Sequence, residues 1–340
     1  MHTQAKFSGM RVLVVDSKLI DLFPHYEIER EMFEKEGIEL DVQNITSQEE
    51  YIRLARDADA LMLIGLKTPR EVIEKLEKCK VIVRYGVGYD VVDVQACTDM
   101  GIALCNVPDA GSYEVGSHAF ALAMDCLRKV TFYDRQIRKG VWHAGSGYTL
   151  KRMYDYTFGY IGFGNIGRVA AGLARPLGVK ILVYDPYVSD EVLEEAGAVR
   201  ATFEEVLSGS DVINMHLPLN PNTYHMISVE QFKLMKKGAI IINTSRGGLI
   251  DQEALMDAID EGIVAAAGLD VNEHEPLTDL NDRLLTYDTV ILTPHTATES
   301  NVYAPTLQEK AAKTALQVLR GELPVNTINR KELIERNKNV

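Results

Sequence analysis

The chain has 340 residues, of which 46% are hydrophobic, and this is enough for two domains of ordinary size with substantial cores. Its net charge of -13 would repel phosphate backbones, so we expect no nucleic-acid partner. No apolar run approaches membrane-spanning length and the N-terminus lacks a signal-peptide core, which predicts a chain without membrane segment or leader. The four cysteines show no C-x-x-C spacing and are typical of reduced thiols in a cytoplasmic protein.

Short apolar runs alternate with helical patterns over the first 105 residues. The expected strands are Arg11 to Val15, Ile38 to Val42, Ala60 to Ile64, Val81 to Val83 and Ala103 to Cys105. The expected helices are Glu27 to Glu36, a Ser47-capped helix ending at Ala55, a helix with Pro69 at its first position, and Val91 to Met100. This alternation predicts a parallel sheet with helices on both faces.

A glycine-containing turn, Arg84 to Asp90, follows the fourth of these strands. Ligands of open α/β sheets bind beyond the carboxyl ends of strands, so the N–H groups of Val87 and Gly88 could hold a carboxylate. The turn alone gives equal weight to a loop that only needs the backbone angles of glycine. Lys67, after the third strand, could add positive charge at the same edge, although a solvated lysine is the commoner case.

A long helical pattern runs from Ser112 to Arg138. Its expected buried stripe consists of Val115, Ala119, Leu122, Ala123, Cys126 and Leu127. A helix of this length is uncommon inside a globular domain and often packs against another subunit, so the pattern predicts a homodimer.

A glycine fingerprint follows the apolar run Thr157 to Ile161. Gly162, Gly164 and Gly167 form G-x-G-x-x-G, in which the glycines allow a tight turn, a close approach of pyrophosphate and close packing of the next helix. A second apolar strand, Lys180 to Tyr184, ends in Asp185, whose carboxylate can bind the ribose hydroxyls. Pro186 and Tyr187 follow without a nearby arginine or lysine, which predicts NAD rather than NADP.

The same α/β alternation continues to the end of the chain. Further strands are expected near Val212 to Met215, Ala239 to Asn243, Val264 to Leu269 and Val290 to Leu292, with helices at Phe203 to Leu207, Val229 to Lys233, Gln252 to Asp260 and Asn301 to Arg320. We therefore expect an α/β protein with two doubly wound parallel-sheet domains and a cleft between them. Residues 1–105 and 299–340 would form a flavodoxin-like substrate-binding domain, and residues 106–298 a Rossmann-like NAD-binding domain of about seven strands.

Three segments that follow predicted strands carry the residue types that hydride transfer to a 2-keto acid needs. They contain Arg246, the run Asp270 to Pro276, and His295. A histidine can donate the proton to the carbonyl oxygen, a carboxylate can fix the tautomer of that histidine, and an arginine can bind the substrate carboxylate. Glu273 and His274 are rivals of Glu275 as partner of the histidine.

Taken together, these motifs resemble the D-isomer-specific 2-hydroxyacid dehydrogenase family over nearly the whole chain. The patterns that carry the resemblance are Arg84 to Asp90, Asn106-Val107-Pro108, the glycine fingerprint, His216-Leu217-Pro218, Asn243 to Gly247, Asp270 with Glu275-Pro276-Leu277, and Pro294-His295. The resemblance implies His295 as acid/base, Glu275 as its partner, and Arg246 as the arginine that binds the substrate carboxylate and carbonyl. It also implies Asp270 at the nicotinamide amide, and Val87 and Gly88 at the substrate carboxylate, with His295 and Arg246 contacting substrate as well.

The residues expected to bind NAD extend beyond the fingerprint. The full set is Gly162, Gly164, Asn165, Ile166, Gly167, Asp185, His216, Pro218, Thr223, Thr244, Arg246, Asp270 and His295. We interpret His216 as a cofactor-loop residue rather than a catalyst, and His118 and His143 as structural. No H-E-x-x-H pattern or cysteine cluster indicates a metal.

The resemblance leaves two functions open. The first is an NAD-dependent interconversion of a D-2-hydroxy acid and its 2-keto acid in the cytoplasm. The second is an NAD(H)-sensing protein, because the family includes transcriptional corepressors that keep the same fold and site. Gly65-Leu66-Lys67 stands where phosphoglycerate dehydrogenases tend to show an Arg-Ser pair, so a phosphoglycerate substrate is not favoured.

Overall fold

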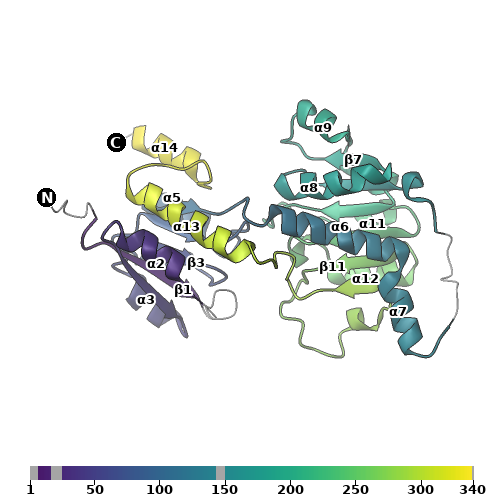
Figure 1. Cartoon of the computed structure of the whole chain (residues 1–340), viewed down its shortest axis with the longest axis horizontal. Coiled ribbons are helices and arrows are strands. Elements are labelled where there is room, and N and C mark those ends of the chain that lie inside the picture. Colours follow the sequence, from purple (N-terminus) through teal and green to yellow (C-terminus); the bar gives the residue numbers. More distant parts are fainter. Residues whose placement is uncertain (1–6, 17–24, 143–149, 339–340) are drawn as a thin grey trace. The chain divides into compact units, whose positions relative to one another are not determined.

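The computed structural model describes residues 7–16, 25–142 and 150–338. The chain divides into two compact units: Met1–Gly111 with Ser300–Val340, here called the first unit, and Ser112–Glu299, the second unit (Figure 1). Each unit is built around one parallel β-sheet, as the sequence predicted. The boundaries lie a few residues from the expected positions at 106 and 299.

The sheet of the first unit has five parallel strands in the order β2-β1-β3-β4-β5, which is the flavodoxin-like order. The strands are β1(Arg11–Asp16), β2(Glu39–Asn44), β3(Ala60–Leu63), β4(Val81–Arg84) and β5(Ala103–Cys105). Side chains alternate between two cores: Val12 and Val14 of β1 face one side, and Leu13 and Val15 face the other. Both faces are therefore buried, which explains the continuous apolar runs in the sequence.

The helices of the first unit are α2(Glu27–Glu34), α3(Gln48–Ala55), α4(Arg70–Ile73), α5(Val94–Met100), α13(Tyr303–Leu319) and α14(Arg330–Lys338). The Ser47 cap is confirmed, since its hydroxyl accepts the Glu50 N–H at 3.2 Å. Two predicted starts were wrong. Pro69 is the extended residue before α4, and α5 begins only at Val94 because the Asp93 carboxylate caps it through the Ala96 N–H.

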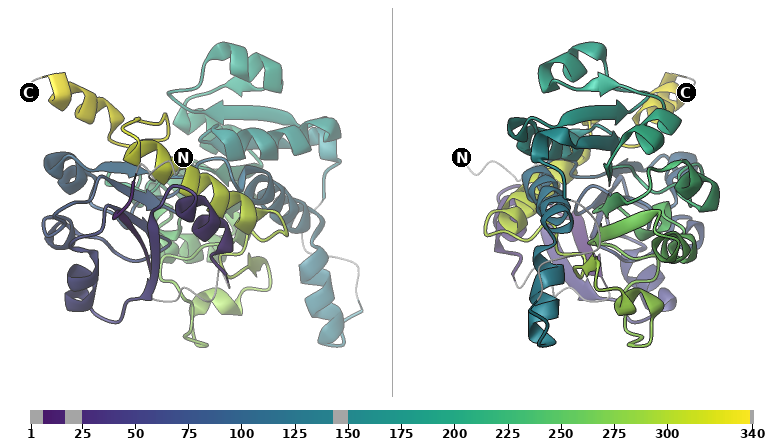
Figure 2. Two further views of the ribbon diagram at one scale, coloured as in Figure 1. Left: turned by 60° about the vertical axis from the view of Figure 1, so that its left-hand side comes forward. Right: turned by 90° about the vertical axis from the view of Figure 1, so that its right-hand side faces the viewer.

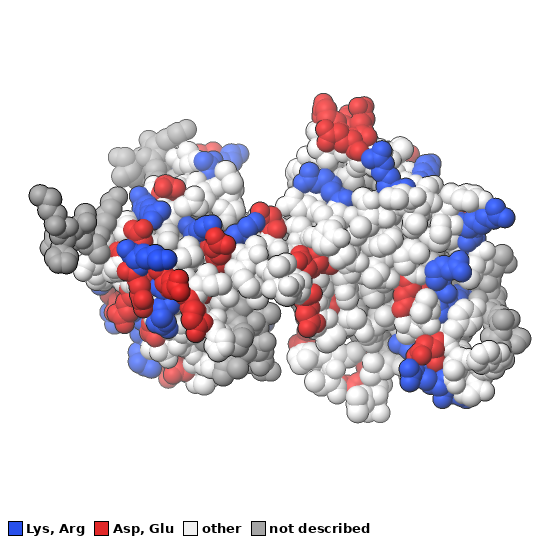
Figure 3. All heavy atoms as spheres, viewed as in Figure 1, with Lys and Arg blue, Asp and Glu red and all other residues white. Residues whose placement is uncertain are grey.

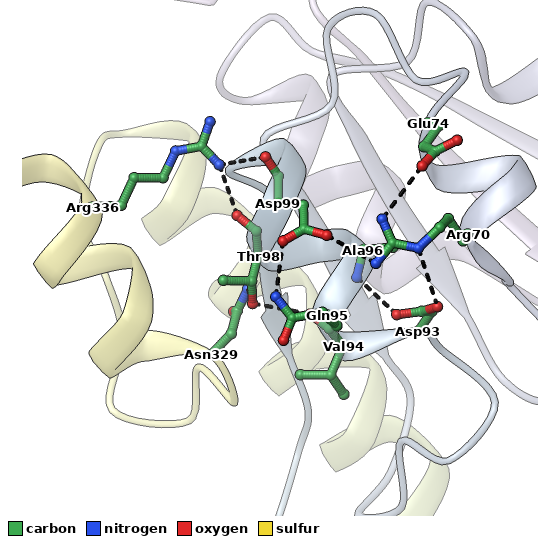
Figure 4. A network of polar contacts seen from close by, with 10 residues as sticks. All are labelled: Arg70, Glu74, Asp93, Val94, Gln95, Ala96, Thr98, Asp99, Asn329 and Arg336. Atoms are coloured by element: carbon green, nitrogen blue, oxygen red, sulfur yellow. Dashed lines mark hydrogen bonds and ion pairs between the residues drawn. The ribbon is translucent and has the colours of Figure 1, made fainter.

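The C-terminal segment is bound to the first unit by polar contacts (Figure 4). Asn329 accepts the Leu104 N–H at 3.0 Å and donates to the carbonyl of Ile102 at 2.9 Å. Arg336 of α14 donates to the Thr98 carbonyl at 2.7 Å, at the end of α5. These bonds satisfy backbone groups at the edge strand β5 and fix α14 against the unit.

The sheet of the second unit has seven parallel strands in the order β12-β11-β10-β9-β6-β7-β8, the order of a Rossmann fold. Six of them match the predicted strands: β6(Thr157–Ile161), β7(Lys180–Tyr184), β9(Val212–Met215), β10(Ala239–Asn243), β11(Val264–Leu269) and β12(Val290–Leu292). The short strand β8(Val199–Arg200) was not predicted. The strand order reverses between β6 and β9, and ligands of such sheets bind at this point.

The helices of the second unit are α6(Ser112–Arg128), α7(Val130–Arg138), α8(Asn165–Ala174), α9(Asp190–Ala196), α10(Phe203–Gly209), α11(Val229–Leu234) and α12(Gln252–Asp260). The single helix predicted from Ser112 to Arg138 was wrong, because the chain breaks at Lys129, which has φ of 57°. The Asp125 carboxylate accepts the N–H of Thr131 at 2.8 Å and so caps the new helix. The predicted buried stripe of α6 is confirmed.

Helix α7 contributes no fully buried side chain to the second unit. Figure 2 shows it reaching past the sheet at the end of α6. Val130 and Ile137 of α7 and Trp142 beyond it are exposed by 62%, 48% and 90%. Arg135 anchors the helix by donating to the carbonyls of Asp288 and Val290 at 2.9 and 2.8 Å. This segment therefore presents apolar side chains to its surroundings.

Charged side chains of both signs are spread over the two units on the face drawn in Figure 3, and acidic ones gather over α9. Within the described stretches, no helix has the length and apolarity to cross a membrane.

Candidate active site

The glycine fingerprint forms the turn between β6 and α8. Gly162 has φ of 89°, and a Cβ there would collide with the carbonyl of His216, so only glycine fits. A Cβ on Gly167 would lie 2.6 Å from the Gly162 oxygen, which explains how closely α8 packs on the turn. A Cβ on Gly164 would meet no atom within 4 Å, so space is open beside the N-terminus of α8, where Asn165 and Ile166 begin the helix.

The Asp185 carboxylate ties the end of β7 to the fingerprint turn. One oxygen accepts the Phe163 N–H at 2.7 Å, and the other accepts the N–H groups of Tyr187 and Val188 at 2.8 and 3.2 Å. The residues directly after Asp185 carry no cation, but Arg200, which the sequence pattern did not indicate, lies close to Asp185. This arginine on β8 donates to the Asp185 carbonyl at 3.2 Å and pairs with Asp190. Only the parallel pairing of β7 with β8 brings it there.

The loop after β9 carries His216, Pro218 and Thr223. The Thr223 hydroxyl donates to the Pro218 carbonyl at 2.7 Å and accepts the Asn220 N–H at 2.9 Å, so it closes the loop on itself. Both ring nitrogens of His216 are buried and have no hydrogen-bond partner in the described part of the chain. Burial lowers the pKa of His216 to about 4. The buried hydroxyl of Thr244, at the end of β10, likewise has no such partner.

The loop after β10 presents Arg246. Asn243 shapes it: the side-chain amide donates to the Arg246 carbonyl at 2.8 Å, and its oxygen accepts the Ser245 N–H at 3.0 Å. A Cβ on Gly247 would overlap the backbone of Asn272, so glycine is required where this loop meets the loop after β11. This close approach brings Arg246 near Glu275, whose pKa its charge helps to lower.

His295 and Glu275 form a pair. The Nδ1 atom of His295 lies 2.8 Å from the Glu275 carboxylate. Burial alone raises the pKa of Glu275, but the bond to His295, its charge, the Asn272 N–H and the charge of Arg246 outweigh that effect and leave the pKa below its usual range. The rival Glu273 instead binds the Nε2 atom of His225 at 2.6 Å.

Asp270, 1% exposed, organises the loop that carries His295. Its carboxylate accepts the N–H groups of Thr296 and Ala297 at 2.9 and 3.0 Å, and its carbonyl accepts the His295 N–H at 2.8 Å. His295 itself has φ of 55°, a left-handed conformation that costs free energy in a non-glycine residue. The loop thus holds the histidine in a strained, fixed backbone position.

The expected substrate residues Val87 and Gly88 lie in the first unit, after β4. Their turn is fixed by the Asn106 side chain, which donates to the Val87 carbonyl at 2.6 Å, and by the Val107 N–H, which donates to the Gly86 carbonyl at 2.9 Å. Val87 is 41% exposed, and Lys67 after β3 is exposed as well.

His143, which we interpreted as structural from the sequence, lies outside the described residues. In the part of the chain that is described, no group of three or more His, Cys, Asp or Glu residues could hold a metal ion.

A Rossmann sheet with a complete glycine fingerprint at its switch point defines the second unit as a dinucleotide-binding α/β domain. The family model described as the NAD-binding domain of D-isomer specific 2-hydroxyacid dehydrogenases matches residues 120–297.

Individual relatives agree with the family model. A glyoxylate reductase of Korarchaeum cryptofilum is 38% identical over 287 residues, which cover 83% of this chain and 86% of the relative. A D-3-phosphoglycerate dehydrogenase of Methanocaldococcus jannaschii is 39% identical over 94% of this chain, which spans 59% of that relative's length. The crystal structure of a glyoxylate reductase from Paecilomyes thermophila superposes with a TM-score of 0.84 at 29% identity, over 95% of this chain and 99% of the other.

The chain belongs to the D-isomer specific 2-hydroxyacid dehydrogenase family. It is an NAD-dependent oxidoreductase of the 2-hydroxyacid dehydrogenase class, and the alternative of an NAD(H) sensor is not favoured.

Proposed function

We propose that the chain reduces a small 2-keto acid to the corresponding D-2-hydroxy acid, and catalyses the reverse reaction, with Arg246, Glu275 and His295 as the catalytic residues. The observation that carries the proposal is the His295–Glu275 pair at 2.8 Å, with the charge of Arg246 close enough to act on the same carboxylate. The D configuration follows the family.

Each of the three side chains has a distinct task. Arg246 binds the substrate carboxylate and polarises the keto oxygen. Glu275 occupies Nδ1 of His295, which leaves Nε2 as the atom that delivers the proton to the keto oxygen and removes it in the reverse direction. Asp270 fixes the loop and so keeps His295 in position for this transfer.

The residues of the second unit fit a dinucleotide. The open space at Gly164, the start of α8 at Asn165 and Ile166, and the Asp185 carboxylate suit a pyrophosphate and a ribose. The hydroxyl of Thr244, which has no hydrogen-bond partner among the described residues, and the loop closed by Pro218 and Thr223 follow the carboxyl ends of the neighbouring parallel strands β10 and β9. When bound, NADH supplies the hydride.

The proposed substrate class rests on the turn after β4 and on the relatives. We assign the N–H groups of Val87 and Gly88 to the substrate carboxylate, because neither forms a hydrogen bond within the described residues. We favour a small unphosphorylated keto acid, since glyoxylate reductases are among the relatives whose match covers 81% or more of this chain and 85% or more of their own length. The phosphoglycerate dehydrogenases are equally similar in sequence, so both classes belong in the assay.

We also propose that the protein acts as a cytoplasmic homodimer. The exposed apolar side chains of α7 and Trp142 support an interface on the second unit. Light scattering should give twice the chain mass of 37.9 kDa, and a monomer at micromolar concentration would contradict this proposal.

The proposed activity is tested by NADH oxidation against a panel of 2-keto acids, from glyoxylate and pyruvate through branched and aromatic acids to hydroxypyruvate and 3-phosphohydroxypyruvate. Turnover of a small unphosphorylated acid is the expected result. Turnover of the phosphorylated acid alone would overturn the substrate class. Tight NADH binding without turnover of any member would contradict the proposed reaction.

A further inference from the structure

Three side chains of the second unit, next to the loop after β12 that carries His295, are connected by hydrogen bonds. The Nε2 atom of His118, on α6, lies 3.0 Å from the hydroxyl oxygen of Thr293, and that hydroxyl lies 2.6 Å from Oδ1 of Asp270. His118 also approaches the same carboxylate oxygen directly, at 3.7 Å. From the sequence we interpreted His118 as structural. These hydrogen bonds could not be predicted, because Asp270 and Thr293 are far from His118 in sequence.

The direction of these hydrogen bonds follows from chemistry. An ionised carboxylate only accepts hydrogen bonds, so the single proton of the Thr293 hydroxyl points to Asp270. The hydroxyl oxygen must then accept from His118, and Nε2 of His118 carries the hydrogen. Without that donor the hydroxyl could rotate, and Asp270 would lose its shortest hydrogen bond.

What depends on Asp270 is the position of His295. The Asp270 carboxylate also binds the N–H groups of Thr296 and Ala297, on the C-terminal side of His295, and Thr293 lies on the N-terminal side. The left-handed backbone of His295 persists only while these neighbours fix it from both sides.

We propose that His118 is a positioning residue for the reaction: by donating from Nε2 to Thr293, it orients the hydroxyl toward Asp270 and keeps the His295 loop in its productive conformation. This inference rests on the proposed function of His295. It gives a role to a side chain on α6 that touches neither the His295 ring nor Glu275 in any described contact.

The test compares four single variants and one double variant in the keto acid assay. His118→Leu removes the donor and should lower kcat about three- to tenfold, the usual value of one hydrogen bond, while the KM for NADH stays within twofold. His118→Gln keeps an N–H at similar reach and should restore kcat to within twofold of wild type. Thr293→Val should impair kcat at least as much, and adding His118→Leu to it should cause no further loss. Ser117→Ala, which removes only a bond to the Glu114 carbonyl on α6, is the control and should behave as wild type.

A full kcat in His118→Leu, equal impairment in His118→Gln, or additive losses in the double variant would each overturn the inference. A second measurement does not depend on turnover. Nitrogen-15 NMR of the wild-type imidazoles at pH 8.5 should show His118 as the Nε2–H tautomer, and an Nδ1–H tautomer would overturn the proposal. If wild type reduces no keto acid, the proposed function fails, and the tautomer still decides whether the chain of hydrogen bonds exists.

Discussion

The buried ring nitrogens of His216 should make the stability of the chain depend on pH. Its pKa is lowered by burial from 6.5 to about 4, and neither ring nitrogen has a partner within the described residues. In the folded state the ring therefore stays neutral, while in the unfolded state it takes up a proton below pH 6.5. Since the unfolded chain binds more protons between pH 6.5 and pH 4, the free energy of unfolding falls as the pH drops through this range.

The size of the effect follows from the shift in pKa. The loss attributable to His216 is about 1.4 kcal/mol at pH 5.5 and roughly 3 kcal/mol by pH 4, relative to pH 8. Replacing the ring by an apolar side chain of similar size, in His216→Leu, should remove this contribution. The matched control is His274→Leu, because His274 is exposed.

The assay is urea unfolding of the cofactor-free protein, followed by circular dichroism at pH 8 and pH 5.5. Other groups titrate in both proteins, so the informative quantity is the difference between wild type and variant. We expect wild type and His274→Leu to lose about 1.4 kcal/mol more than His216→Leu between the two pH values. Equal losses in all three proteins would refute the reasoning from burial.

Three further predictions concern single side chains. Arg246→Ala should lower kcat/KM for the keto acid by about 10²–10³ in steady-state kinetics. The affinity for NADH, measured by fluorescence titration, should stay within threefold of wild type. An unchanged kcat/KM would contradict the proposed role of Arg246. Asp185→Asn should raise the ratio of kcat/KM for NADPH over NADH by about tenfold, because a 2′-phosphate no longer meets a carboxylate and Arg200 lies nearby. Adding Arg200→Gln should reverse part of this gain. A constant ratio would contradict the proposed role of Asp185 in cofactor choice. Asp125→Ala should cost about 1 kcal/mol of unfolding free energy in urea, because α7 loses its cap at Thr131, whereas Asp134→Ala on the exposed face of α7 should cost less than half as much.

The buried parts of the fold could be predicted well from the sequence. Strands such as β6 and β9 are buried on both faces, so most of their positions are apolar or small and the pattern is easily recognised. Asn214 of β9 is an exception, and its buried side chain donates to the Gly159 carbonyl. The exposed strand β8 has no such requirement: Val199 and Arg200 are both exposed, and only their pairing with β7 makes them a strand.

The break at Lys129 shows a different limit. The apolar periodicity of α6 continues into α7, so the pattern predicted one helix. What ends α6 is a competing cap, in which the Asp125 side chain binds Thr131 and Lys129 takes a left-handed conformation. Neither residue type is unusual inside a helix, and the pattern alone does not reveal the cap.

In the site, the spacing predicted which residue types lie at the strand ends, and the family resemblance, not the spacing, singled out Glu275 as the partner of His295, which the structure confirms. Glu273 and Glu275 are equivalent by spacing, and only the loop conformation directs Glu275 to His295 and Glu273 to His225. The hydrogen bond of His118 to Thr293 could not be predicted for the same reason, since it joins α6 to a loop after β12.

The central claim is that His295 transfers the proton during NADH-dependent reduction of a keto acid. The most direct measurement is the turnover of wild type and His295→Gln with the preferred keto acid, together with the NADH dissociation constant of each protein. We predict that turnover falls by about 10²–10⁴ while the dissociation constant stays within threefold. Turnover within a fewfold of wild type, with NADH still bound, would contradict the claim.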